Sequence, residues 1–279
     1  MSLLKGIYAA IWMGWQREMK WTNPALSFLI KTVAPTAAVL GAAAVYWFGS
    51  SFAGLFTPER LAYIVIGASL YAQVGAYAFV PTSAIAEGKW SNLYPQVYIT
   101  PTSSIPYLAG RCLASFVDSA PVVAISITAS YYASYTLFGA APTILVSLMS
   151  ILMVTAALLL SLPAALALGY ILGSYSIFVS RFEWALPSYV SGVLMIFSEA
   201  LFPASILPYP LSLIAEALPF TYLMRASRAA LISDSWTLYV NSMAFLALGG
   251  IILFAIGIVA FSYAERSARA RGFIDKKVM

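Results

Sequence analysis

Ionisable side chains inside apolar stretches are the first candidates for chemistry in this sequence. Asp118 lies within the apolar stretch Ile105–Tyr135. Because burying a charge in lipid is costly, such a residue usually serves ion coupling, a substrate pathway or a buried hydrogen-bond network. A proton relay needs several acids spread through the apolar segments, and Asp118 is nearly alone. The sequence therefore favours a packed, hydrogen-bonded Asp118, with a place in a substrate pathway or an ion-coupling role as the alternatives.

Two further acids flank a proline-rich stretch later in the chain. Glu199 and Glu216 have two open interpretations: they line the exit of a pathway, or they accept bonds from backbone N–H groups freed by broken helices. Tyr131, Tyr132 and Tyr135 cluster near the end of an apolar segment. Such residues mostly form the aromatic belt at a membrane surface. A lining for an amphipathic or sugar substrate is the second possibility.

Several kinds of chemistry are excluded by residue types. The chain has no histidine and one cysteine, Cys112, which removes the commonest metal ligand and any intrachain disulfide. Its Gly88-Lys89 pair lacks both the earlier glycine and the following Ser or Thr of a phosphate-binding loop. We therefore expect that the chain is not an enzyme and binds no cofactor or metal of its own.

Composition indicates the elements that must position these residues. Hydrophobic residues make up 62% of the 279 residues and charged residues 9%, with a mean hydropathy of +0.87. Soluble domains are about one quarter charged, so this chain has too few charges to cover a water-exposed surface. We predict an all-α polytopic membrane protein that forms one permease domain over residues 1–279, with no binding of nucleic acid.

Apolar runs of about 20 residues predict transmembrane helices. Five such runs are Leu26–Phe48, Leu61–Val80, Ile105–Tyr135, Thr143–Val179 and Tyr239–Tyr263. The third and fourth are longer than one crossing needs, so we expect each to project from the bilayer or to bend near Pro121 or Pro163. A sixth, shorter run begins near Pro187 and ends at Leu201.

The sixth run leads into a segment interrupted by prolines, residues 200–222. Its prolines are Pro203, Pro208, Pro210 and Pro219. Proline breaks a helix interior, and lipid cannot satisfy the freed backbone groups. We predict a re-entrant helical hairpin between the fifth and sixth spans, shielded by protein; an external loop with apolar packing is the alternative.

Basic residues predict the orientation. With six crossings, only Arg60, Arg225 and Arg228 lie on one side, and the remaining Lys and Arg residues lie on the other. By the positive-inside tendency both termini are cytoplasmic, including a basic tail at residues 264–279. Residues 1–23 show helical periodicity, with Leu4, Ile7, Ile11 and Trp15 on one face. This indicates an amphipathic helix on the membrane surface, either as an anchor or as a docking element.

Two stretches resemble a known family. The first places an acidic residue and a glycine before a Thr-Pro and a Gly-basic pair: Ala86–Trp90, Thr100–Ser103 and Leu108–Arg111. The second is punctuated by prolines before the last span: Phe202-Pro203, Leu207-Pro208, Leu218–Tyr222 and Arg228. In this order, with six spans, they resemble the permeases of ABC-2-type exporters. Leu218 stands where that family usually has Asn.

The resemblance implies a machine with several chains. A separate nucleotide-binding ATPase subunit would hold ATP and Mg, and a second permease copy would complete a homodimer or heterodimer in membrane lipid. Residues 1–23 would be the connecting helix, and residues 83–104 a cytoplasmic coupling loop. The coupling residues would be Glu87, Gly88, Lys89, Trp90, Arg17 and Glu18. The substrate would be a drug, lipid or glycan-type molecule leaving through the plasma membrane of a prokaryote-like cell.

Two other functional classes compete with this interpretation. A self-sufficient ion-coupled carrier or channel would need polar residues along several spans, and the chain offers mainly Asp118. An intramembrane enzyme acting on lipid would need a catalytic constellation, and the sequence shows none.

Overall fold

The computed structural model describes residues 3–20, 23–90, 104–178 and 185–271, which are mainly helical and contain no strand. The elements are α1 (Leu3–Lys20), α2 (Pro24–Phe52), α3 (Pro58–Trp90), α5 (Ile105–Phe138), α6 (Leu148–Leu160), α7 (Leu162–Phe178), α8 (Ala185–Phe197), η1 (Ala204–Ile206), α9 (Leu211–Ala217), α10 (Pro219–Arg228), η2 (Ala229–Ser233) and α11 (Trp236–Arg271).

Five helical segments are long and apolar enough to cross a membrane. They are Phe28–Phe52, Pro58–Lys89, Ile105–Phe138, Leu148–Phe178 and Trp236–Arg271, and Ala185–Phe197 is a shorter apolar helix. Large apolar side chains such as Leu152, Ile251 and Val259 are more than half exposed on α6 and α11. An apolar surface of this extent suits lipid rather than water. The architecture is that of a multi-pass helical membrane protein.

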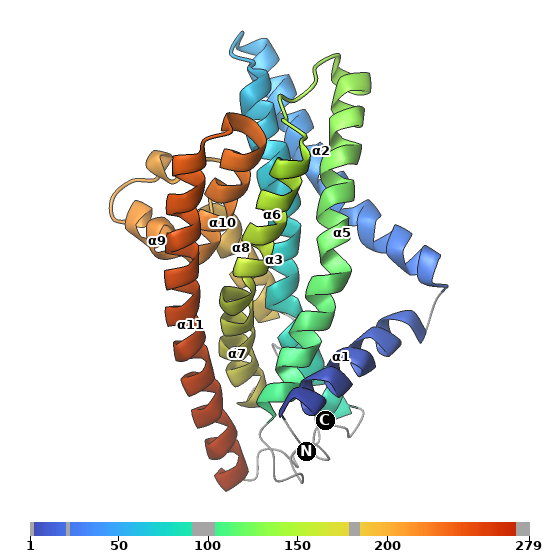
Figure 1. Ribbon diagram of the computed structural model, residues 1–279, viewed down its shortest axis with the longest axis vertical. Helices are drawn as coiled ribbons and strands as arrows, with labels where there is room; N and C mark the ends of the chain where they lie inside the picture. The colour runs from blue at the N-terminus through green and yellow to red at the C-terminus, as the bar shows by residue number, and fades with distance from the viewer. Residues whose placement is uncertain (1–2, 21–22, 91–103, 179–184, 272–279) are drawn as a thin grey trace.

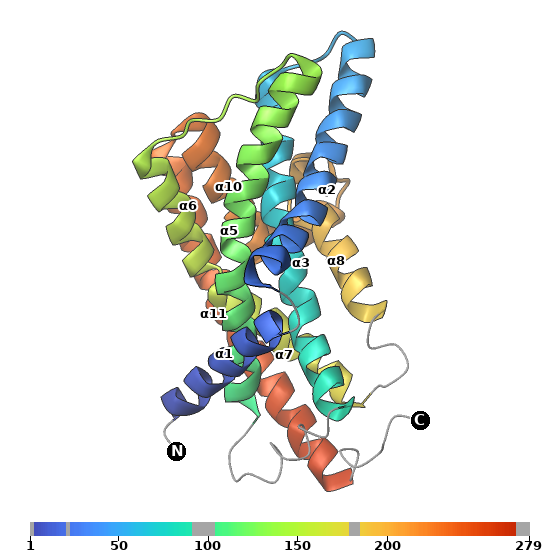
Figure 2. The same cartoon turned by 90° about the vertical axis from the view of Figure 1, so that its right-hand side faces the viewer.

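The long helices run side by side along one axis of the molecule, and α1 crosses them obliquely at one end (Figures 1 and 2). The last turns of α11 lie at that same end, which we call the α1 end. Along the bundle, α7 and α11 pack closely, since a Cβ on Gly257 would lie 2.9 Å from the carbonyl oxygen of Ala167. The main apolar core lies between these helices and α3, α5, α8 and α10.

The prolines inside the two longest apolar runs have different effects on their helices. The fourth apolar run is interrupted at Ser161, two residues before Pro163, and the Ser161 hydroxyl donates to the carbonyl of Leu158 (2.7 Å). The helix is thus interrupted near Pro163, one of the two positions where a bend was expected, whereas α5 continues through Pro121 to Phe138. That helix ends at Gly139, whose φ of 65° is the left-handed conformation that glycine adopts without steric cost.

The second span is longer than its apolar run. Helix α3 continues to Trp90, so residues 83–90 are helical and extend the span itself. The coupling loop expected over residues 83–104 thus begins with the last two turns of α3. Its remainder, residues 91–103, lies outside the described part of the chain. Of the expected basic tail at 264–279, the residues up to Arg271 are helical and continue α11.

Helix α1 packs on α5 through small residues. A Cβ on Gly110 of α5 would lie 2.4 Å from the Cβ of Ala10, and a Cβ on Gly14 would lie 3.0 Å from the Cβ of Ala114. Tyr8 and Trp12 are more than half exposed on the same helix. The contact is therefore built from small residues, while Trp15 of the expected apolar face is exposed and Ile7 and Ile11 are half-buried. Close approach of two backbones requires small side chains at the contact.

We expect Gly110→Val to release α1 from α5. The new side chain would collide with Ala10 and with the carbonyl of Ile7, 2.9 Å from the Cβ position. Limited trypsin digestion in detergent should then cut after Lys5 several times faster than in the wild type. Gly192→Val on α8 is the matched control, because nothing lies within 4 Å of its Cβ position. Equal cleavage rates in the two variants would contradict the proposed contact.

Candidate functional site

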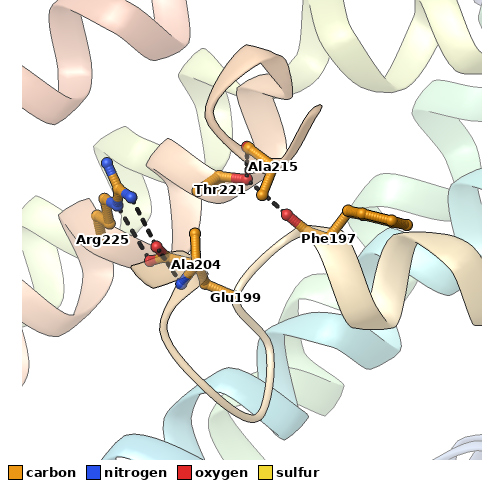
Figure 3. Close-up of polar contacts among 6 residues, drawn as sticks. All are labelled: Phe197, Glu199, Ala204, Ala215, Thr221 and Arg225. Carbon is orange, nitrogen blue, oxygen red and sulfur yellow. Dashed lines mark hydrogen bonds and ion pairs between the residues drawn. The ribbon is translucent and has the colours of Figure 1, made fainter. Parts of the chain in front are cut away.

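The segment that follows α8 is held by a buried ion pair. After α8 ends at Phe197, Glu199 adopts a φ of 58°, a conformation rare for a residue with a side chain. Its carboxylate accepts hydrogen bonds from the Arg225 guanidinium at 2.6 and 3.0 Å and from the backbone N–H of Ala204 at 2.9 Å (Figure 3). Only 4% of Glu199 is exposed. Three charge-assisted bonds fix the chain where the helix stops.

Two further side chains of α10 satisfy carbonyls left free by the breaks. The Thr221 hydroxyl lies 3.0 Å from the carbonyl oxygen of Phe197 and 2.6 Å from that of Ala215, at the ends of α8 and α9 (Figure 3). Arg228 donates to the carbonyl of Ala200 at 2.9 Å. Helix ends buried away from water need such partners.

Arg228 also joins this segment to α3. Its guanidinium donates to the carbonyl of Tyr63 at 3.2 and 3.3 Å and lies 3.3 Å from the centre of the Tyr63 ring. The arginine is 6% exposed, so this cation–π contact is largely desolvated and correspondingly strong. We call Thr221, Arg225 and Arg228, which recur along one side of α10, the α10 seam.

Of the two acids expected near the prolines, the structure buries one. Glu199 accepts a bond from a freed backbone N–H, as the second interpretation required, while Glu216 is exposed on α9. The Arg225 partner was missed because the pair is 26 residues apart in sequence. The only sequence signal was the presence of two arginines beside an otherwise apolar segment.

Asp118 has a cationic partner. Lys31 of α2 donates a hydrogen bond to its carboxylate, and both side chains are partly buried. This agrees with the expected hydrogen-bonded aspartate, and it places a charge pair between two spans. Tyr132 and Tyr135 are more than 60% exposed near the other end of α5, and Tyr131 stacks edge-on against Tyr132. That exposure fits an aromatic belt.

Of the predicted coupling residues, Glu87, Gly88 and Lys89 lie near the end of α3, at the α1 end of the molecule (Figure 1). The Glu87 carboxylate accepts a hydrogen bond from Arg111 of α5 at 3.3 Å and forms an ion pair with it, and Arg111 is 6% exposed. Lys89 donates to the carbonyl of Ser176 at the end of α7, and Gly88 is buried between them. The side chains of Arg17, Glu18 and Trp90 lie outside the described part of the structure.

One functional candidate at this end was not anticipated. Glu265 of α11 is 5% exposed and accepts from the backbone N–H of Ser104, which precedes α5, at 3.2 Å. It also pairs with Arg269 one turn later at 2.7 Å. A carboxylate at a helix N-terminus is stabilised by the free N–H groups there. The sequence placed Glu265 in a basic tail and gave no sign of this contact.

The two polar regions support different tasks. Among the described residues no group of His, Cys, Asp or Glu could hold a metal ion. The α10 seam supports a broken helix inside an apolar protein, and the α1 end links four helices by charges. No family model and no curated protein matches the chain. The assignment of a function therefore depends on these structural observations.

Proposed function

We propose that this chain is the membrane-spanning permease subunit of an ATP-driven exporter whose ATPase is a separate polypeptide. The exporter would move a hydrophobic or amphipathic substrate out of the cytoplasm. The chain itself would bind neither ATP nor Mg; the ATPase subunit would hold both.

The charge-linked α1 end is the observation that carries this proposal. Ion pairs and hydrogen bonds join the end of α3 to α5 through Glu87 and Arg111, and α11 to α5 through Glu265. Small residues fix α1 to the same part of α5. A force applied at this end would therefore move several spans as one body, which is the rigid-body transmission that an external motor needs.

The broken segment supports the second half of the proposal. Its helices α9 and α10 connect α8 to α11, and α9 lies to the side of the bundle, short of the end that α2 and α5 reach (Figure 1). We infer that α8 is a short fifth span and that residues 200–222 form a re-entrant hairpin before a sixth span. The excess of basic residues at the α1 end supports a cytoplasmic location of that end, and a second permease copy would complete the pathway.

Purification of the tagged chain in mild detergent from its native cell tests the proposal. We expect a nucleotide-binding ATPase subunit to copurify and to hydrolyse ATP in the complex. Reconstitution of the chain alone is the counter-test. A lone oligomer that transports under an ion gradient, without any ATPase, would refute the proposal and support an ion-coupled carrier. The Lys31–Asp118 pair between two spans is the observation that favours this second candidate.

Within the complex, Glu87→Gln and Lys89→Met should uncouple hydrolysis from export. Each removes a link between the end of α3 and a neighbouring helix. Allosteric couplings are typically about 5- to 150-fold, so we expect substrate-stimulated ATPase activity to fall at least about fivefold. Glu59→Gln is the matched control, since Glu59 is an exposed acid at the opposite end of the same helix. Unchanged stimulation in all three variants would remove this role from the α3 end.

A further inference from the structure

A polar cavity lies between α1, α2, α3 and α5, away from the α10 seam. Its volume is about 270 Å³. Charged and polar residues make up one part of its lining: Lys31, Gln73, Arg111, Ser115, Asp118 and Ser119. Apolar residues, including Pro35, Ala76 and Val122, make up the rest. The cavity thus presents both charge signs beside an apolar wall.

Two buried polar atoms of the lining residues lack a partner within the described part of the chain. They are the amide oxygen of Gln73 and Nε of Arg111. The Gln73 side chain is 1% exposed, and its Nε2 donates to the Tyr77 hydroxyl at 2.8 Å, which leaves the amide oxygen as the open acceptor. A buried polar group without a partner costs free energy, so an acceptor and a donor here call for a ligand that supplies both.

The charges narrow the ligand class. Lys31 and Asp118, which pair with each other, supply one charge of each sign, and Arg111, which pairs with Glu87, supplies a second positive charge. A simple anion could replace only Asp118 as the partner of Lys31, and a simple cation could replace only Lys31 as the partner of Asp118, so either would leave one charge of the pair without a partner. A ligand with an anionic and a cationic group matches both. Gln73 and Asp118 are acceptors, so the cationic group should carry N–H donors.

We propose that this cavity binds a phosphoethanolamine group, with its phosphate toward Lys31 and Arg111 and its primary ammonium toward Asp118 and Gln73. The source favoured by the surroundings is a membrane lipid. Helix α1 contributes Gly14 to the cavity and exposes Tyr8 and Trp12, side chains that favour the level of lipid headgroups. The apolar lining then receives the start of the acyl chains. This site requires no ATPase and stands whether or not the chain belongs to an exporter.

The full chain in detergent micelles provides the test, with binding followed by native mass spectrometry. The probes are dihexanoyl phosphatidylethanolamine, the matching phosphatidylcholine and phosphatidylglycerol, and free phosphoethanolamine. We expect the ethanolamine lipid to bind at least about tenfold more tightly than the other two lipids. The choline group has no N–H donor and the glycerol group has no positive charge. Equal affinities for the three lipids would overturn the proposal.

Variants locate the binding. Gln73→Leu and Asp118→Asn should each weaken binding of the ethanolamine lipid at least about tenfold. Thr136→Val, on the exposed far part of α5, should leave the affinity unchanged. Because Gln73→Leu could disturb packing, the lipid series on the wild-type chain remains an independent arm. Undiminished binding in Asp118→Asn would contradict the assignment. Free phosphoethanolamine that binds as tightly as the lipid would keep the site and identify a soluble ligand.

Discussion

Replacing Gly67 by alanine is expected to destabilise this protein severely. Gly67 lies in α3 where the broken segment crosses it, and a Cβ there would lie 1.9 Å from the carbonyl oxygen of Ala200 and 2.2 Å from Nη2 of Arg228. The methyl group would therefore occupy the space of the hydrogen bond between those two groups, 2.9 Å long. Neither partner can simply rotate away, because one is backbone and the other is buried.

The expected magnitude follows from two separate costs. Overpacking a well-filled interior costs about 1–3 kcal/mol, and a lost hydrogen bond from a charged group costs about 1.5–3 kcal/mol more. We expect a loss of at least about 3 kcal/mol, which corresponds to a fall in Tm of roughly 6–12 °C for a chain of this size. Thermal unfolding in detergent, followed by circular dichroism, measures it.

Gly41→Ala is the matched control for this substitution. Gly41 is also a helical glycine in an apolar span, yet nothing lies within 4 Å of its Cβ position. Alanine is a better helix former than glycine, so this variant should be neutral or slightly more stable. A Gly67→Ala protein as stable as Gly41→Ala would show that α3 and the broken segment do not approach so closely.

The spans could be predicted from the sequence because the properties that determine them are local. Length and hydropathy alone predict a crossing, and the five apolar runs agree with the five long helical segments to within several residues at most ends. The Ser161 break was also local, since Pro163 cannot donate the bond that a continuous helix needs there. At Pro121 the sequence left a bend open, and the helix continues through this proline to Phe138.

The contacts that define the candidate sites could not be predicted from the sequence, because they join distant parts of the chain. Asp118 pairs with Lys31, 87 residues earlier, and Glu265 reaches Ser104 across 161 residues. No periodicity records such pairs. The small residues at the contact of α1 were not anticipated for a related reason: hydropathy highlights large apolar residues, whereas the contact with Gly110 depends on Ala10.

Removing the carboxylate of Glu199 is the second change with a large expected effect. Glu199→Ala would leave the Arg225 guanidinium and the N–H of Ala204 without their acceptor. Breaking a buried ion pair by deleting one partner costs about 3–5 kcal/mol. Because the Arg225 side chain keeps 30% of its surface exposed, solvent recovers part of that cost, and we expect a loss of about 3 kcal/mol. Glu216→Ala is the matched control, since an exposed acid of the same segment should change stability by no more than about 0.5 kcal/mol.

A double-mutant cycle separates the ion pair from the backbone contact. If the Arg225 bonds dominate, Arg225→Ala alone should cause most of the loss of stability expected for Glu199→Ala. Adding Glu199→Ala to it should then cost little more, with a coupling energy of roughly 1–3 kcal/mol. Strict additivity of the two single losses would mean that the pair contributes nothing. In that case the bond from Ala204 and the left-handed backbone at Glu199 alone would hold the chain at the end of α8. Thermal unfolding of the four proteins in one detergent decides between these outcomes, and so decides whether the α10 seam is held by charge or by backbone geometry.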